Sequence, residues 1–319
     1  MIVYAGKIPS QEFSSDVWVL QGANGAGGTP TWTQLAPAGP APPARHMHSM
    51  VYDRKNNRMV VFGGHILGGT PFANDLWVLQ NANGLGGTPA WGALSPAGTA
   101  PAAREWHTAV LDEINNRMIV FGGTKGGLLN DVWVLDHANG LGGMPSWILL
   151  NPKGTVPAAR AGHTAVYDGA NNRMIVFGGG HGGGGPFYDD VWVLEHANGM
   201  GGTSAWIALS PTGTPPSVRE DHVAIYDPGS NRMVVFGGWD GPNYFNDVWV
   251  LEKANGLGGT PKWLTVTPSG TPPSKRELAS AVYDDVCHRM ILFGGSYSGE
   301  PICNSGSCTN DVWVLKHVP

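Results

Sequence analysis

The chain has few charged residues, no basic cluster and no long apolar run. Only 13% of its 319 residues are charged, against about 25% in an average globular protein. The net charge is −5 and lysine and arginine are scattered, so the electrostatic signature of a nucleic-acid-binding protein is missing. No apolar stretch reaches the roughly 18 residues of a transmembrane helix, and no signal peptide is recognisable after Met1. The sequence therefore predicts neither a nucleic-acid partner nor a membrane span.

Cysteine is also scarce, and the three cysteines are too few for a disulfide framework. Cys303 and Cys308 flank the short loop Asn-Ser-Gly-Ser and could close it as a local bridge. A bridge would indicate an oxidising compartment, so that the protein is secreted or on a cell surface, whereas two reduced thiols fit the sequence equally well. The localisation therefore stays open, and Cys287 is predicted to be unpaired.

Glycine and proline are abundant, and they recur at fixed positions between apolar runs. The run Arg-Met-(Ile/Val)-Val-Phe-Gly-Gly recurs every 56 to 59 residues, with Met1–Gly6 as a partial first copy. Its five arginines are Arg58, Arg117, Arg173, Arg232 and, in a close variant, Arg289. The motifs between the copies keep one order: Asp-Val-Trp-Val-Leu, Ala-Asn-Gly, Trp-x-x-Leu-x-Pro-x-Gly and Pro-x-x-Arg-x-x-His. One module is therefore repeated along the chain.

Each module contains four short runs rich in Val, Ile, Tyr and Trp, and these runs are predicted to be strands a, b, c and d. In the second module strand a covers residues 48–52, strand b 59–62 and strand c 76–79, and strand d starts at Trp91. Asn56-Asn57 and Asn83-Gly84 are predicted to form the a-to-b and c-to-d turns. A single four-stranded blade cannot bury both faces, so the blades are expected to stack in a ring.

The glycine pairs that end strand b, each followed by Asp-Val-Trp or Asp-Leu-Trp, closely resemble the kelch motif. These pairs lie at 63–64, 122–123, 178–179, 237–238 and 294–295. By this resemblance, which covers essentially the whole chain, the protein is identified as a bacterial-type kelch-repeat β-propeller. It implies an all-β fold of six four-stranded antiparallel blades in a single domain, 1–319, with modules at approximately 1–40, 41–99, 100–155, 156–214, 215–271 and 272–319. The fold does not select a function, because kelch propellers include enzymes, sugar-processing proteins and protein-binding adaptors.

The ring is expected to be incomplete where the chain ends meet. Strands b and c occur six times, but strands a and d only five times. Either unassigned residues supply the closing strands, or the ring is notched, or Met1 is an internal start and an upstream segment supplies them; we favour the last two together. An unpaired blade edge can accept a strand from another chain, so a dimer through the incomplete blades is also predicted.

The loops between strands b and c, and between d and a, vary from blade to blade and share one face of the propeller, named here the variable face. Trp106 and Trp239 lie in these loops, outside the strand positions of the other eleven tryptophans. They indicate a binding surface, although single aromatics packed on neighbouring loops are an alternative. The predicted ligand-binding residues are His46, His65, Trp106, His181, Asp221, Trp239, Asp240, Tyr244 and Tyr297.

An Arg-x-x-His element begins strand a in four blades and is predicted to bond the neighbouring blade. One histidine per blade is too dispersed to bind a metal, and no metal or other cofactor is predicted. The residues after these arginines vary, and they give the catalytic candidates Arg104, Glu105, Arg219, Glu220 and Glu277. Such a glutamate could act as an acid or base if burial raised its pKa, as in the kelch sugar mutarotases that this architecture resembles. Ordinary ion pairing at the channel mouth is the alternative.

Two functions therefore compete. The first is a binding scaffold that recognises a protein or a glycan through the variable face around the central channel. The second is a mutarotase-like or epimerase-like enzyme that acts on a small sugar-like metabolite through Arg/Glu pairs at the channel mouth. A third possibility is a purely structural spacer. A pocket with converging glutamate and arginine side chains would favour the enzyme, and a broad face carrying Trp106 and Trp239 would favour binding.

Overall fold

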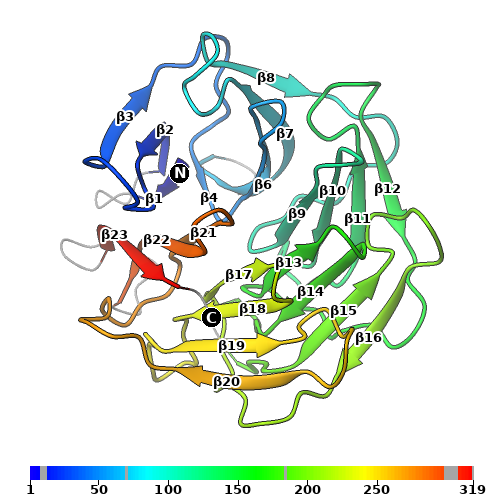
Figure 1. Ribbon diagram of the computed structural model, residues 1–319. Coiled ribbons are helices and arrows are strands. Elements are labelled where there is room, and N and C mark those ends of the chain that lie inside the picture. The colour runs from blue at the N-terminus through cyan, green and yellow to red at the C-terminus, as the bar shows by residue number, and fades with distance from the viewer. Residues whose placement is uncertain (8–12, 69–70, 183–184, 298–307, 318–319) are drawn as a thin grey trace.

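The computed structural model describes residues 1–7, 13–68, 71–182, 185–297 and 308–317, and these contain strands and turns but no helix. The strands form six antiparallel sheets, and Figure 1 shows that these are arranged in a ring. A channel lies at the centre of the ring. The predicted six-bladed, all-β propeller is confirmed. Because the described residues have no helix, they have none long and apolar enough to cross a membrane.

The first three blades occupy the N-terminal half of the ring. Blade 1 contains β1 (Ile2–Lys7), β2 (Phe13–Gln21) and β3 (Thr31–Leu35). Blade 2 contains β4 (Arg45–His46), β5 (Ser49–Asp53), β6 (Arg58–Ile66), β7 (Phe72–Gln80) and β8 (Ala90–Leu94). Blade 3 contains β9 (Thr108–Asp112), β10 (Arg117–Phe121), β11 (Val132–Asp136) and β12 (Ser146–Leu150).

The last three blades complete the circle. Blade 4 contains β13 (Thr164–Asp168), β14 (Arg173–Phe177), β15 (Val191–Glu195) and β16 (Ala205–Leu209). Blade 5 contains β17 (Val223–Asp227), β18 (Arg232–Phe236), β19 (Val248–Glu252) and β20 (Lys262–Val266). Blade 6 contains β21 (Ser280–Asp284), β22 (Arg289–Ser296) and β23 (Cys308–Lys316).

The blades at the two chain ends have three strands each among the described residues. Within this part of the chain, blade 1 has no inner strand a and blade 6 has no outer strand d. The predicted strands of blade 2 are found, but β6 and β7 extend beyond them, because the pairing continues through a register shift between Phe62 and Gly64. In the a-to-b turn, Asn57 adopts a φ of 52°, as its small polar side chain allows.

The blades pack through a repeated aromatic contact. The phenylalanine of strand b lies against the strand d tryptophan of the next blade, with ring centroids 5.0 Å apart for Phe121 and Trp206. Strand b is buried on both faces, and Met118 and Phe121 are fully inaccessible to solvent. Its run of apolar residues is therefore continuous rather than alternating.

A polar contact also joins neighbouring blades, and it closes the ring. Asn198 in the c-to-d turn of blade 4 donates a hydrogen bond to Asp112 of blade 3, with the nitrogen and oxygen 2.6 Å apart. Between the terminal blades, Asn24 donates in the same way to Asp284 over 2.5 Å. Blade 1 therefore docks on blade 6 as internal blades dock on each other, although the described part of each of these two blades has three strands.

Candidate functional site

The arginines that begin strand a are buried, and each pairs with an aspartate that precedes the strand c tryptophan. Arg104 has no exposed surface, and its two terminal nitrogens donate to the carboxylate of Asp131 over 2.7 and 2.8 Å. Trp133 Nε1 donates to the same carboxylate over 2.7 Å. Burial alone would raise the pKa of Asp131, but the hydrogen bonds and charge of Arg104 outweigh it and lower that pKa.

Arg219 pairs with Asp247 in the same way, over 2.8 and 2.9 Å. The catalytic candidates Arg104 and Arg219 are thus held by aspartates of their own blades and do not pair with the adjacent Glu105 and Glu220. Both arginine side chains are fully buried.

Three strand a histidines, His107, His163 and His222, link neighbouring blades as the sequence predicted. The Nε2 atom of His107 lies 2.8 Å from Ser49 Oγ of the preceding blade, and His163 contacts Thr108 over 2.9 Å. Burial, followed by the charge of Arg104, lowers the pKa of His107 well below its usual value. The described residues contain no group of three or more side chains placed to hold a metal ion.

The residue before each of these histidine positions forms an inner ring around the channel. Five residues have left-handed φ angles between 53° and 61°, namely Met47, Trp106, Gly162, Asp221 and Leu278. Each of the last four donates its backbone N–H to the carbonyl oxygen of the preceding member, over 2.8 to 3.2 Å. The inner ring lines a channel of about 620 Å³, so Trp106 and Asp221 are placed at the channel wall.

Acidic groups gather behind this inner ring. Glu220 is fully buried, and Glu277 is 6% exposed. Burial, and next the charge of Glu220, raises the pKa of Glu277 to about 7. Burial and the charges of the two glutamates also raise the pKa of Asp221 well above its usual value. The blade 5 and blade 6 carboxyl groups therefore share one weakly solvated environment.

Trp106 and Trp239, the tryptophans outside the repeated strand positions, belong to a second group of side chains that contacts these acids. A Cβ atom on Gly182 would lie 3.3 Å from the ring of Trp106, and the Gly182 N–H donates to Glu220 Oε2 over 3.1 Å. Phe187 packs edge-on against Trp239 with ring centroids 5.4 Å apart. Tyr244 stacks beside Trp239 at 6.4 Å. The aromatic-acidic cluster is defined here as Trp106, Phe187, Glu220, Trp239 and Tyr244.

The sequence prediction missed Phe187, although a signal for it existed. Phe187 stands three residues before the Asp-Val-Trp aspartate of blade 4, and Tyr244 stands at the same place in blade 5. A blade-by-blade alignment of the loops would have selected both residues. The b-to-c loop of blade 4 carries Gly182 and Phe187, and it connects Trp106 of blade 3 with Trp239 of blade 5.

The remaining candidates lie elsewhere on the variable face. His46 and His65 are ring neighbours at 5.1 Å, and His65 Nδ1 lies 2.8 Å from Glu105 Oε2. Burial, followed by the charges of His65 and Lys7, lowers the pKa of His46 to about 4. Three other candidates are not brought into either group by the contacts of the described residues: His181 and Tyr297 are exposed, and Asp240 bonds its own loop at Asn243. Cys308 is disulfide-bonded and Cys287 is free, whereas Cys303 lies outside the described residues.

Replacing Glu277 with glutamine is expected to stabilise the protein at pH 8 by about 2–3 kcal/mol and to have little effect at pH 4.5. The pKa of Glu277 is about 7 in the folded protein, above the ordinary value of 4.5 for a glutamate. The folded state therefore holds this proton more tightly than the unfolded state. Wild-type stability falls as the pH rises from about 4.5 to about 7, and glutamine removes that loss.

The measurement is urea unfolding of wild type and Glu277→Gln at several pH values. Asp285→Asn, which changes a carboxylate that is 48% exposed, serves as the control and should leave the pH profile unchanged. If Glu277→Gln and wild type had parallel pH profiles, the carboxyl group would be well solvated.

Comparison with known proteins places this architecture in a family. The model of the KLHDC2/KLHL20/DRC7 Kelch-repeats domain matches residues 1–141, 87–200 and 143–318. Human host cell factor 2 is 30% identical over 90% of this chain, which spans 38% of that protein. Kelch domain-containing protein 3 of Bos taurus is 28% identical over 83% of this chain, which spans 66% of it. Tip elongation aberrant protein 1 of Schizosaccharomyces pombe is 30% identical over 64% of this chain, which spans 17% of it. The repeat, the blades and these matches agree, and the chain belongs to the kelch-repeat β-propeller family.

Proposed function

We propose that this propeller is a protein-interaction scaffold that binds its partner through the aromatic-acidic cluster and the adjoining inner ring. The observation that carries the proposal is the junction of half-buried aromatic rings from three blades with buried carboxyl groups behind the inner ring. Aromatic side chains of this kind are enriched at the centres of protein interfaces. Membership of a family that includes protein-binding adaptors supports the same function.

The charges at the cluster favour a basic side chain as the group that is recognised. Glu220, Asp221 and Glu277 repel one another, and this repulsion contributes to the raised pKa values of Asp221 and Glu277. An arginine or lysine of a partner would relieve that repulsion through charge-assisted hydrogen bonds. The ring of Trp106 beside the acids offers the cation a further favourable contact. The ligand class that fits best is therefore a polypeptide with an exposed basic residue.

One observation favours a second candidate function. A carboxyl group with a pKa of about 7, such as Glu277, suits general acid or base catalysis near neutral pH. The enzyme hypothesis requires arginines that are free to act with the glutamates. Arg104 and Arg219 are instead paired with Asp131 and Asp247. An enzyme acting on a small sugar would depend on the carboxyl groups alone, and this makes the scaffold the better-supported function.

The test is to probe a peptide array and a glycan array with wild type and with the double variant Glu220→Gln/Glu277→Gln. Wild type is expected to retain peptides with arginine or lysine, and the double variant is expected to lose at least tenfold in affinity for them. Asp285→Asn removes one carboxylate from the a-to-b turns on the opposite face and should bind like wild type. Binding of glycans alone, or of peptides regardless of their charge, would contradict the proposal.

A further inference from the structure

The c-to-d turns of blades 3, 4 and 5 each contain an asparagine followed by a glycine, at the place where the blade contacts the preceding one. The asparagines are Asn139, Asn198 and Asn255, and they are 2–3% exposed. An Asn-Gly pair is chemically labile in a flexible chain, because glycine has no side chain to hinder attack of its backbone nitrogen on the asparagine amide. These turns therefore place a reactive pair inside each of three blade interfaces.

The folded turn holds the side-chain amide of Asn198 from both ends. Its Oδ1 atom accepts hydrogen bonds from Asn172 Nδ2 over 2.6 Å and from the Met200 N–H over 2.8 Å. Its Nδ2 atom donates to Asp112 of the preceding blade over 2.6 Å. The turns of blades 3 and 5 repeat these three contacts. The amide is therefore fixed by its own blade and by the neighbouring blade.

The backbone nitrogen that would attack the amide is also engaged in a hydrogen bond. The Gly199 N–H donates to the His196 carbonyl oxygen over 2.9 Å, and Gly140 and Gly256 donate to the equivalent carbonyl oxygens over the same distance. Cyclisation requires the glycine nitrogen to leave this hydrogen bond and the amide to turn towards it. The closed interface therefore protects the three asparagines.

Opening of a blade interface releases both groups. The glycine nitrogen can then form a bond to Cγ of the asparagine and pass its proton to the Nδ2 group, which leaves as ammonia. The product is a succinimide ring. Water opens this ring at either carbonyl group and leaves aspartate or isoaspartate. The net reaction consumes a water molecule and releases an ammonia molecule, so it needs no other reactant.

The products do not fit the closed interface. Aspartate formed from Asn198 places a second carboxylate beside Asp112 at a site that excludes water, and like charges at such a site repel each other. Isoaspartate adds a methylene group to the backbone and so disturbs the hydrogen bond with the Met200 N–H. A blade that is deamidated while it is open is therefore impaired in closing again.

We propose that Asn139, Asn198 and Asn255 are modification sites, at which deamidation follows the opening of a blade interface and then hinders its closure. Local opening differs in free energy from one part of a protein to another. The lifetime of the folded propeller is then set by how often its weakest interface opens, and not by the intrinsic rate of the Asn-Gly reaction. The proposal is independent of the partner that the propeller binds.

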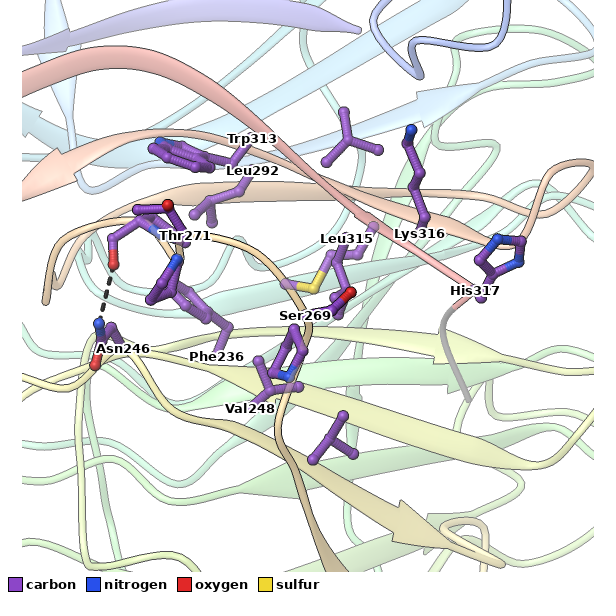
Figure 2. Close-up of a pocket in the computed structure, with 16 residues that line it drawn as sticks. Phe236, Asn246, Val248, Ser269, Thr271, Leu292, Trp313, Leu315, Lys316 and His317 are labelled. Carbon is purple, nitrogen blue, oxygen red and sulfur yellow. Dashed lines mark hydrogen bonds between the residues drawn. The ribbon is translucent and has the colours of Figure 1, made fainter.

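The first test is to incubate the full chain at neutral pH, with and without guanidinium chloride, and to follow each asparagine by peptide mass spectrometry. The three sites are expected to react at least tenfold more slowly in the folded protein than in the denaturant. Asn246 is the internal control, because it donates to the Pro273 carbonyl oxygen over 3.0 Å but is followed by Asp247 (Figure 2). In the denaturant it should react far more slowly than the Asn-Gly sites. Equal rates at these sites in the two conditions would overturn the proposal.

Two matched variants assign the reaction to single interfaces. Asp112→Ala removes the acceptor of Asn198, and it is expected to speed deamidation there at least threefold while the other two sites keep the wild-type rate. Asp168→Ala removes the acceptor of Asn255 and should speed the reaction at that site alone. The same acceleration at all three sites would show that global unfolding exposes them, and this would contradict opening of a single interface.

Hydrogen exchange of wild type decides if these variants do not fold. The N–H groups of Gly140, Gly199 and Gly256 should exchange faster than those of the strand b core, in the same order as the deamidation rates. Exchange of these glycines only at the rate of global unfolding would refute the proposal.

The effect of the product on closure is measured with Asn198→Asp. This variant is expected to unfold at a lower urea concentration than wild type, whereas Asn151→Asp, at an exposed position, should leave the midpoint unchanged. An unchanged midpoint for Asn198→Asp would show that deamidation does not hinder closure.

Discussion

Replacing Asp131 with alanine is expected to lower the free energy of unfolding by about 3–5 kcal/mol. The change leaves the guanidinium of Arg104 without exposed surface and without its opposite charge, and it also removes the acceptor for Trp133 Nε1. A buried charge without a partner costs far more than the intact pair contributes. Urea unfolding followed by circular dichroism measures the difference, and the slope of the transition should stay unchanged.

Glu105→Gln provides the comparison, because Glu105 adjoins Arg104 in sequence but lies 2.8 Å from His65 in the structure. Its effect on stability is expected to be smaller than that of Asp131→Ala, because His65 is partly exposed and glutamine keeps an oxygen that can accept from the imidazole ring. The opposite order, with Glu105→Gln more damaging than Asp131→Ala, would show that Arg104 relies on its sequence neighbour. The pair of variants therefore separates a structural arginine from a catalytic one.

The pairing of Arg104 illustrates what the repeat could and could not reveal. The sequence placed a glutamate next to the arginine, but successive residues of an extended chain point to opposite sides. The actual partner, Asp131, lies 27 residues away and across the blade. Its recurrence in every Asp-Val-Trp motif was visible, but a recurrent residue does not show which other recurrent residue it contacts. That assignment needs the register between strands.

On the variable face, too, the sequence identified residues but not the contacts between them. Trp106 and Trp239 could be selected because they depart from a strict repeat. Their connection through Phe187 and Gly182 depends on how the blade 4 loop lies over its neighbours, and this is set by packing among three blades. The number of blades followed from counting motifs, because each strand type has a distinct sequence. The loops differ in sequence from blade to blade, so their contacts could not be predicted from a repeated motif.

Replacing Trp206 with alanine is the second change with a large expected effect, a loss of about 3–5 kcal/mol. Trp206 is 4% exposed and packs between Phe121 of the preceding blade, at 5.0 Å, and Trp192 of its own blade, at 6.5 Å. Its Nε1 atom has no hydrogen-bond partner among the described residues, so the loss is one of packing and cavity formation. Trp206→Phe should therefore recover part of the stability in urea unfolding.

Trp32→Ala is the control, because Trp32 is the strand d tryptophan of blade 1 but is only half-buried. Its ring lies 5.3 Å from Phe293 and closes the ring of blades. Less apolar surface is buried there, so its loss is expected to cost about 1–2 kcal/mol. A cost equal to that of Trp206→Ala would mean that the closing interface carries the same energy as an internal one. The ring would then unfold as one cooperative unit in which the three-stranded blades are as strongly held as the complete blades.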